Sequence, residues 1–355
     1  MIFYINLFIF IFIFGFVGTF GKNKEFAFVC RRTVMLILFI VSAVRFGIGT
    51  DYQNYEILYK AISNGKEFYK FSEPAFYWLN NFLASNDLSF QVLIVICSAI
   101  TVFFFDLSTN RKTFFYEVLL FYSLIYLQSY CLLRQMIACS ISIYALKNPK
   151  RSITFIFLIV AALFHKTFWC LFLLVYLSKF IKLSKIKIEL LLLVLFFVIF
   201  CTNIVEITLQ RLTSLFSISI GVGYFELQRR IGLVVFTRYI FMLLFWISLY
   251  GIIKKTDRKM RLFNTLLIAL FLVEFIGGRL LIFAARFPQT FYVFFFIPFT
   301  KNNSVEINTL VKNKYKIRSS FFIESVCLII LVLFVQVGTG ENLNHIVPYK
   351  SIFSF

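Results

Sequence analysis

The segment from Arg45 to Tyr59, RFGIGTDYQNYEILY, places a cation, a carboxylate and a row of phenol rings close together. If a short outer helix lies here, Tyr52, Tyr55 and Tyr59 share one face of it, because they are spaced three and four residues apart. One interpretation is a saccharide-stacking face beside an Arg45–Asp51 pair. The other is an interfacial helix with an aromatic belt, in which Asp51 only complements the helix dipole.

A second stretch, CLLRQMIACSISIYAL over residues 131–146, carries one arginine inside an apolar run. Arg134 shares a helical face with Ala138, Ser142 and Ala145, and small residues mark helix faces that pack closely in lipid. Arg134 is therefore expected to point into a helix bundle, where an ionisable side chain is costly and indicates a functional site. The alternative is that Arg134 lies near the outer end of its helix and extends to the membrane interface.

His165, one of two histidines, lies in the stretch IVAALFHKTFW. Ala161 and Ala162 precede it by four and three residues, so the imidazole shares a face with small residues and is expected to face protein. With an ordinary pKa of about 6.5, a histidine at a cavity mouth can act as a general base near neutral pH. The alternative is a buried, hydrogen-bonded histidine with a structural role.

Arg279 and Arg286 are seven residues apart, which places them on one helical face about 10 Å apart at 1.5 Å per residue. Glycines before them and a proline after them indicate an interrupted span of the kind that lines a cavity. Glu274 could instead neutralise one of them, and Arg238, near the start of another span, is equally typical of an interface anchor. These three arginines are further candidates for ligand residues.

The scaffold that positions these residues must lie in a membrane. Of 355 residues, 61% are apolar and 15% are charged, whereas a soluble domain has about 45–50% and about 25%. This composition excludes a cytosolic enzyme, a disordered chain and a fibrous protein. It predicts an all-α, polytopic integral membrane helical bundle. At roughly 20 residues per span the length allows about ten to thirteen crossings and no soluble domain.

We expect about twelve transmembrane helices in a single membrane domain over residues 1–355, with long outer loops at about 50–87 and 206–231. The expected spans lie approximately at residues 2–21, 33–49, 88–107, 114–130, 131–146, 152–165, 167–181, 188–205, 232–253, 262–282, 287–300 and 319–337.

Charge sets the expected orientation. Most of the 36 Lys and Arg residues lie in alternate loops, which by the positive-inside rule face the cytoplasm, so that both termini lie outside. The remaining cations are enriched in Arg, whose planar group binds carboxylate or phosphate through two parallel hydrogen bonds. This distribution predicts an anionic ligand on the outer side. The net charge of +20 forms no contiguous basic face, so nucleic acid is not expected.

The sequence lacks the motifs of several common reaction types and sites. The seven cysteines form no CxxC pair, and the chain has no Walker loop, no GxSxG elbow and no HExxH motif. A disulfide framework, a metal site, ATP hydrolysis and serine hydrolysis are therefore not expected.

The chain resembles the EpsG family of membrane glycan polymerases, which is similar to the O-antigen polymerases called Wzy. The resemblance rests on four motifs in order: Arg45 with GTDYxxY (Gly49–Tyr55), EPAFY (Glu73–Tyr77), LRQMIA (Leu133–Ala138) and AxLFHxT, which contains His165 and Thr167. It implies a GT-C-like fold in a bacterial inner membrane, with both termini on the periplasmic side.

The implied reaction transfers a growing polysaccharide from its polyprenyl-pyrophosphate carrier to the terminal sugar of a lipid-linked repeat unit on the periplasmic face. Cations would hold the pyrophosphate without a metal or other cofactor. His165 is the first candidate for the base and Asp51 the second, while Tyr52 and Tyr55 would stack on sugars. The remaining candidate substrate-binding residues are Arg45, Arg134, Gln135, Arg238, Arg279 and Arg286. The expected partners are the lipid-linked donor and acceptor, the bilayer, a chain-length regulator and a flippase.

Two alternatives fit the same composition, a transporter and another lipid-linked glycan transferase. A flippase for the same lipid-linked oligosaccharide would also have about twelve spans and interior arginines, although internal repeats would be expected in it. An O-antigen ligase-type transferase would deliver finished polymer to a lipid core.

Overall fold

The structure is a computed structural model that describes residues 2–148, 150–178, 180, 262, 264–270, 288–299 and 346–353. The chain divides into two compact units, Met1–Phe172 with Phe295–Phe355, and Leu173–Phe294. All the side-chain contacts discussed below lie within the first unit. Of the expected spans, those at 188–205, 232–253 and 319–337 and most of that at 262–282 lie outside the described residues.

The described residues form helices and one isolated β-bridge, which agrees with the expected all-α class. Up to residue 180 the α-helices in chain order are α1 (Ile2–Phe20), α2 (Lys24–Ala43), α3 (Tyr52–Ser63), α4 (Pro74–Ser85), α5 (Phe90–Ser108), α6 (Phe114–Phe121), α7 (Leu133–Lys147), α8 (Arg151–Phe164) and α9 (Phe168–Leu177), and residues 264–270 are also helical. A π-helix, η1 (Tyr122–Tyr126), and a 3₁₀-helix, η2 (Gln128–Tyr130), connect α6 to α7, and a second 3₁₀-helix, η4, spans Pro288–Phe299.

Three helices in the described part of the chain, α1, α2 and α5, are long and apolar enough to cross a membrane. Helices α8 and α9 are apolar but shorter. Helix α1 exposes an apolar stripe of Ile5, Ile9, Ile13 and Phe16, each more than 40% exposed. A large apolar face left open is typical of a helix that contacts lipid. The protein is therefore a helical membrane protein, and the total of about twelve spans remains a prediction.

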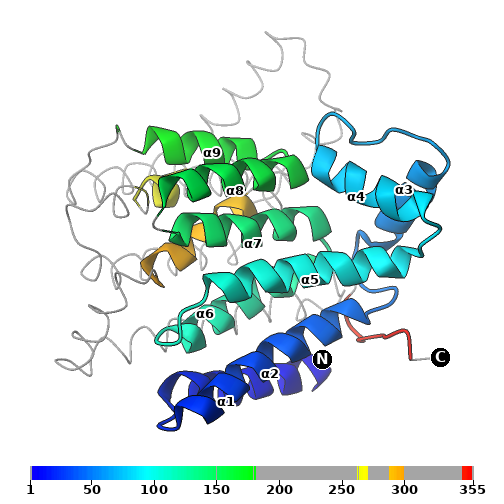
Figure 1. Ribbon diagram of the computed structural model, residues 1–355. Helices are drawn as coiled ribbons and strands as arrows, with labels where there is room; N and C mark the ends of the chain where they lie inside the picture. The colour runs from blue at the N-terminus through cyan, green and yellow to red at the C-terminus, as the bar shows by residue number, and fades with distance from the viewer. Residues whose placement is uncertain are drawn as a thin grey trace, which may run out of the picture. The chain divides into compact units, whose positions relative to one another are not determined.

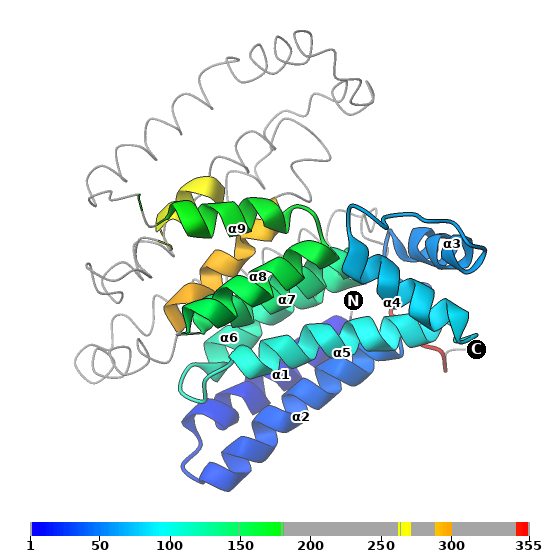
Figure 2. The same cartoon turned by 45° about the horizontal axis from the view of Figure 1, so that its top comes forward.

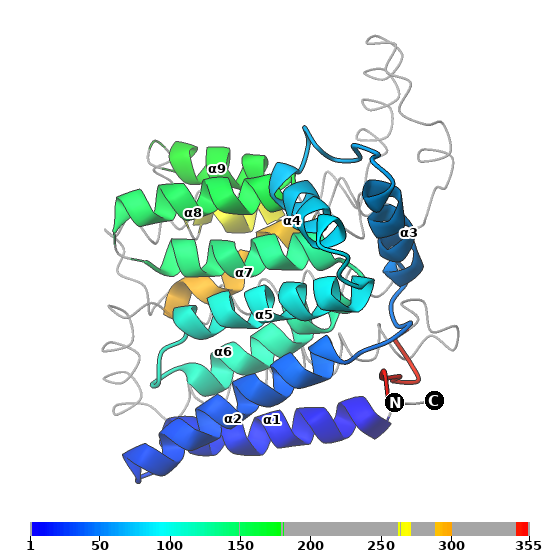
Figure 3. The same cartoon turned by 45° about the vertical axis from the view of Figure 1, so that its right-hand side comes forward.

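Helix α7 forms the centre of the first unit. Thirteen of its 15 residues are buried, the exceptions being Arg134 and Tyr144. Helices α5 and α8 pack against it, and α2 packs against α5, so that α2, α5, α7 and α8 lie side by side (Figure 3). A helix buried on nearly all sides fits the stripe of Ala and Ser residues that the sequence places on it.

The second expected span, 33–49, is displaced in the structure. Asn23 caps α2 by accepting hydrogen bonds from the amides of Glu25 and Phe26, so the helix begins well before residue 33. It ends at Ala43, and the positive φ of Gly47 and Gly49 belongs to an irregular connection. Arg45 therefore lies beyond the helix rather than on it.

The loop expected at about 50–87 contains two helices, α3 and α4, that pack on each other (Figure 1). Helix α4 also contacts α8 and the beginning of α5, so this helical pair lies against the end of the bundle (Figure 2). We call this the His165 end. It is the end where α2 and α8 finish and where α5 and α7 begin.

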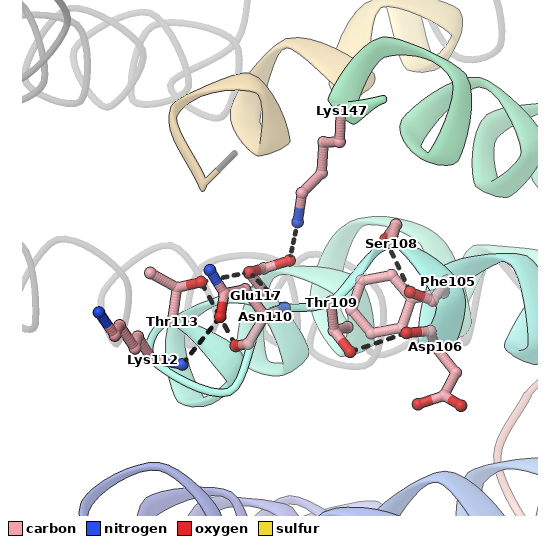
Figure 4. A network of polar contacts seen from close by, with 9 residues as sticks. All are labelled: Phe105, Asp106, Ser108, Thr109, Asn110, Lys112, Thr113, Glu117 and Lys147. Carbon is pink, nitrogen blue, oxygen red and sulfur yellow. Dashed lines mark hydrogen bonds and ion pairs between the residues drawn. The ribbon is translucent and has the colours of Figure 1, made fainter. Parts of the chain in front are cut away.

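The opposite end, which we call the Lys147 end, contains the finish of α5 and α7 and the beginning of α6. Lys147 extends from the last turn of α7 to the carboxylate of Glu117 on α6 (Figure 4). The Thr113 hydroxyl also donates to Glu117, and the Asn110 amide donates to the same oxygen at 3.4 Å. Both charged side chains are buried, at 5% and 0% exposed.

Candidate active site

Glu73 is the centre of a polar cluster at the His165 end, and we call this group of Glu73, Arg134 and His165 the Glu73 cluster. Arg134 forms an ion pair with one carboxylate oxygen of Glu73. The other oxygen lies 3.8 Å from Nε2 of His165 and accepts a 3.4 Å hydrogen bond from the Lys166 amide. Glu73 is 2% exposed, while Arg134 and His165 are 16% and 17% exposed. The acid is therefore buried, and the two basic groups lie at the edge of solvent.

Three separate helix ends bring this cluster together. Glu73 occupies the N-cap position of α4, and Pro74 is the first helical residue, where its fixed φ favours the start of a helix. The Glu73 side chain makes no capping hydrogen bond, because its carboxylate is turned to Arg134. Arg134 lies in the first turn of α7, and His165 is the C-cap of α8.

Aromatic rings surround the guanidinium group of Arg134. Its central carbon lies 4.2 Å from the ring centre of Tyr69 and 5.6 Å from those of Tyr55 and Phe76. The Tyr55 side chain also hydrogen-bonds to it. Tyr69 reaches this position with a φ of 64°, a left-handed conformation that costs a residue other than glycine on the order of 1–3 kcal/mol. Such strain is typical of functional sites, and it supports a role for the Tyr69 ring beside Arg134.

The hydrogen bonds of His165 indicate which ring nitrogen can act as a base. Nδ1 lies 2.8 Å from the Thr167 hydroxyl and accepts from the Thr167 amide at 3.4 Å. An acceptor at Nδ1 assigns the proton of the neutral ring to Nε2, which faces Glu73. The arrangement follows the logic of a catalytic triad, in which a carboxylate orients one nitrogen and leaves the other as the base.

The field at this site favours an anion. Arg134 lies at the N-terminus of α7, where the helix dipole is positive and the N-cap residue, Leu132, makes no side-chain capping hydrogen bond. Its Nε is buried and has no hydrogen-bond partner in the described part of the chain. A cation placed at the positive end of a helix is unfavourable by itself, and a negatively charged ligand would relieve the repulsion.

Arg45 does not belong to the Glu73 cluster. Its side chain is fully buried, donates to the Ser42 hydroxyl at 3.0 Å and to the Ser129 carbonyl at 3.2 Å, and lies 4.6 Å from the ring centre of Tyr130. No carboxylate among the described residues pairs with it. Backbone hydrogen bonds from Ile352 to Val44 and from Phe46 to Lys350 bind the C-terminal segment beside it. The expected Arg45–Asp51 pair is therefore not formed.

The first half of the chain contains four further candidate residues, Asp51, Gln135, Tyr52 and Tyr55. Asp51 is the N-cap of α3 without a capping hydrogen bond from its side chain. Gln135 is buried in α7 at 2% exposed, and Tyr52 and Tyr55 are each 5% exposed. Burial raises the pKa of Tyr52. Its phenol is therefore neutral near neutral pH and is a hydrogen-bonding group rather than a base.

Arg238, Arg279 and Arg286, together with the expected outer loop at 206–231, lie outside the described residues. Of the ten candidates, the structure thus brings Arg134, His165 and Tyr55 together, and it places Arg45 in a separate buried environment.

Sequence reasoning did not assign a role to Glu73, Tyr69 or Thr167. A signal for Glu73 was present in the motif EPAFY, because a glutamate immediately before a proline is typical of a helix start. Nothing in the local pattern indicates that its carboxylate pairs with a residue 61 positions later.

Comparison with known proteins gives one family. The sequence model described as the EpsG family matches residues 28–351, which is most of the chain. No curated protein and no solved structure matches the chain.

Proposed function

Because this chain belongs to the EpsG family, a family of Wzy-like polymerases, we propose that the Glu73 cluster is the polymerisation site of a membrane polysaccharide polymerase. In the proposed reaction the protein joins oligosaccharide repeat units that are linked to polyprenyl pyrophosphate. The reaction takes place on the periplasmic face of the bacterial inner membrane. The donor and the acceptor are both lipid-linked.

A single observation carries this proposal. Arg134 and His165, two basic residues of different kinds, meet on opposite oxygens of one buried carboxylate. Group transfer from a pyrophosphate needs a cation for the leaving group and a base for the acceptor hydroxyl. The cluster supplies both at one end of the bundle, with both partly exposed.

Arg134 has the role of holding the departing pyrophosphate. Its guanidinium group and the N-terminus of α7 stabilise the negative charge that develops on the bridging oxygen as the bond to the anomeric carbon breaks. The aromatic rings around Arg134 limit access of water, which strengthens its interaction with the anion.

His165 has the role of the base, through Nδ1. In the structure the Thr167 hydroxyl lies 2.8 Å from this nitrogen and stands in the place that the acceptor hydroxyl would take. The acceptor hydroxyl gives its proton to Nδ1 while its oxygen forms the new bond to the anomeric carbon, and the carrier leaves as the pyrophosphate anion. Glu73 acts through His165, because it orients Nε2 and stabilises the imidazolium that forms.

A deletion strain tests the proposal against its alternatives. Without the gene, surface glycan is expected to be reduced to a single capped repeat, and the wild-type chain is expected to restore the polymer ladder. Finished polymer that remains on the carrier lipid would instead identify a ligase. Absence of both the repeat and the polymer from the outer surface would identify a flippase.

A further inference from the structure

A cavity lies beside α3, and we call it the α3 cavity. It has a volume of about 480 Å³ and is lined by residues of α3, of the turn between α4 and α5, and of the beginning of α5. Arg134, Glu73 and His165 do not line it. The cavity is therefore distinct from the Glu73 cluster, although both are at the His165 end.

One wall of the α3 cavity is aromatic. Phe46 is 40% exposed, and its ring centre lies 6.1 Å from that of Tyr52. Phe90 also lines the cavity, and its ring centre lies 5.3 Å from that of Tyr52 and 5.9 Å from that of Tyr59. The Tyr59 hydroxyl donates to the Leu88 carbonyl at 2.7 Å. The rings are thus held in place by protein before any ligand enters.

The polar groups of the α3 cavity are mainly hydrogen-bond acceptors. Glu56 pairs with Lys60 at 2.7 Å, which leaves its second oxygen available. The carboxylate of Asp87 makes no hydrogen bond or ion pair with the described residues. The Gln91 amide nitrogen donates to the Ala43 carbonyl at 2.6 Å, while its buried carbonyl oxygen has no hydrogen-bond partner among the residues that the structure describes. An unpartnered buried oxygen is costly, and a ligand that donates a hydrogen bond would satisfy it.

The charge of the cavity decides what kind of ligand fits. Two carboxylates and one ammonium line it, so a phosphate or another anion would be repelled. A molecule with many hydroxyl groups and an apolar face has the complementary surface, because hydroxyls donate to carboxylate and amide oxygens and the apolar face packs on aromatic rings.

We propose that the α3 cavity binds an uncharged sugar unit of the glycan and so holds a chain between successive additions. This inference rests on the proposed function. Tyr55 contacts Arg134, and its neighbour Glu56 lines the cavity. Helix α3 therefore borders both sites. The sugar in the cavity is part of the glycan that provides the reacting hydroxyl or the reacting anomeric carbon. It is a different sugar unit from the one that reacts.

The direct test measures binding to the full-length chain in detergent micelles. The probe is a mixture of short oligosaccharides obtained by mild acid hydrolysis of the polymer from the wild-type strain, observed by saturation-transfer NMR. Wild-type protein is expected to transfer saturation to the sugar protons, and Glu56→Gln/Asp87→Asn is expected to lose at least several-fold of this signal. Glu67→Gln is the matched control, since Glu67 pairs with Lys70 on the surface in the same way but does not line the cavity.

Two further results separate this inference from the proposed function. The Arg134→Gln variant should keep the binding signal although its polymerisation is strongly slowed, and Glu56→Gln/Asp87→Asn should make polymer of a several-fold shorter modal length. An equal binding signal in wild type and the double variant would overturn the inference, as would displacement of the oligosaccharide by inorganic pyrophosphate. Loss of polymer in the deletion strain would still support the proposed function in either case.

Discussion

Helix α7 carries an ion pair at each of its ends, Arg134–Glu73 at the His165 end and Lys147–Glu117 at the Lys147 end. The Lys147 pair is closed: the ammonium is 5% exposed and the carboxylate also accepts from Thr113 and Asn110. In the Arg134 pair the guanidinium is 16% exposed, and its Nε makes no hydrogen bond within the described residues.

The helix dipole separates the two pairs further. Lys147 lies in the last turn of α7, where a cation interacts favourably with the negative end of the dipole, whereas Arg134 lies in the first turn, at the positive end. The Lys147 pair is therefore satisfied by the protein alone. The Arg134 pair leaves a cation at the positive end of the dipole and a donor, Nε, that no described residue accepts from, and such a site is expected to bind an anion.

Breaking the Lys147 pair should produce the largest effect, and it should be an effect on stability. Lys147→Met leaves the Glu117 carboxylate buried without its cation, which costs on the order of 3–5 kcal/mol. A lower melting temperature and a lower yield in detergent would report this loss. Replacing both residues, as in Lys147→Met/Glu117→Leu, should restore most of the stability, with polymer made per folded molecule as in wild type.

Breaking the Arg134 pair should instead reduce the rate of polymerisation. Arg134→Gln is expected to slow polymerisation on the order of 10²–10³-fold, the cost of losing one group that stabilises developing charge. Polymer yield per folded molecule, measured on glycan gels, checks this.

The double variant Arg134→Gln/Glu73→Gln leaves no unpaired charge and should fold, yet it should stay inactive, in contrast to the double variant at the Lys147 end. Arg134→Lys should insert normally but give shorter polymer, because an ammonium group keeps the positive charge but cannot form two parallel hydrogen bonds to a phosphate as a guanidinium group does. Normal ladder lengths from that variant would contradict a role in holding pyrophosphate.

Removing the base should have a smaller effect than removing the cation. His165→Ala is expected to lower the rate by roughly 10²-fold, at the lower end of general-base contributions, with little change in melting temperature. Lys166→Ala is the control, since its side chain is exposed and only its backbone amide contacts Glu73. Full polymerisation by His165→Ala would exclude His165 as the base.

The smallest expected effect concerns the aromatic ring over the guanidinium group. Tyr69→Leu removes a cation–π contact worth about 0.5–1 kcal/mol, so polymer yield should fall only about 2–5-fold. Phe71→Leu in the same loop is the matched control, because Phe71 is 90% exposed and does not contact Arg134. Equal yields from the two variants would remove Tyr69 from the site.

The sequence predicted which charged residues would be unusual. Composition indicated a helical membrane protein, and the spacing of small residues around Arg134 and His165 indicated that both face protein. These predictions depend on period and hydropathy, which are local properties. The structure agrees with them, since α7 is almost wholly buried and both side chains lie at the same end of the bundle.

The position and the partners of the Arg45 side chain could not be predicted in the same way. Its expected partner was Asp51, six positions later, but the end of α2 at Ala43 removes it from the helix. The connection that follows is constrained by a residue far along the chain: Gly49 has a φ of 105°, and a β-carbon there would clash with the carbonyl oxygen of Tyr130. Only the packing of these two segments determines where the side chain points.

Residue type and helical period alone therefore indicated the membrane environment of this protein, its helical class and the protein-facing orientation of Arg134 and His165. Tertiary structure alone decided that Glu73 joins Arg134 to His165 and that Lys147 has a partner of its own. The physical reason is that a buried charge is stabilised by whichever opposite charge the fold brings within a few ångströms, and separation along the chain does not constrain that choice.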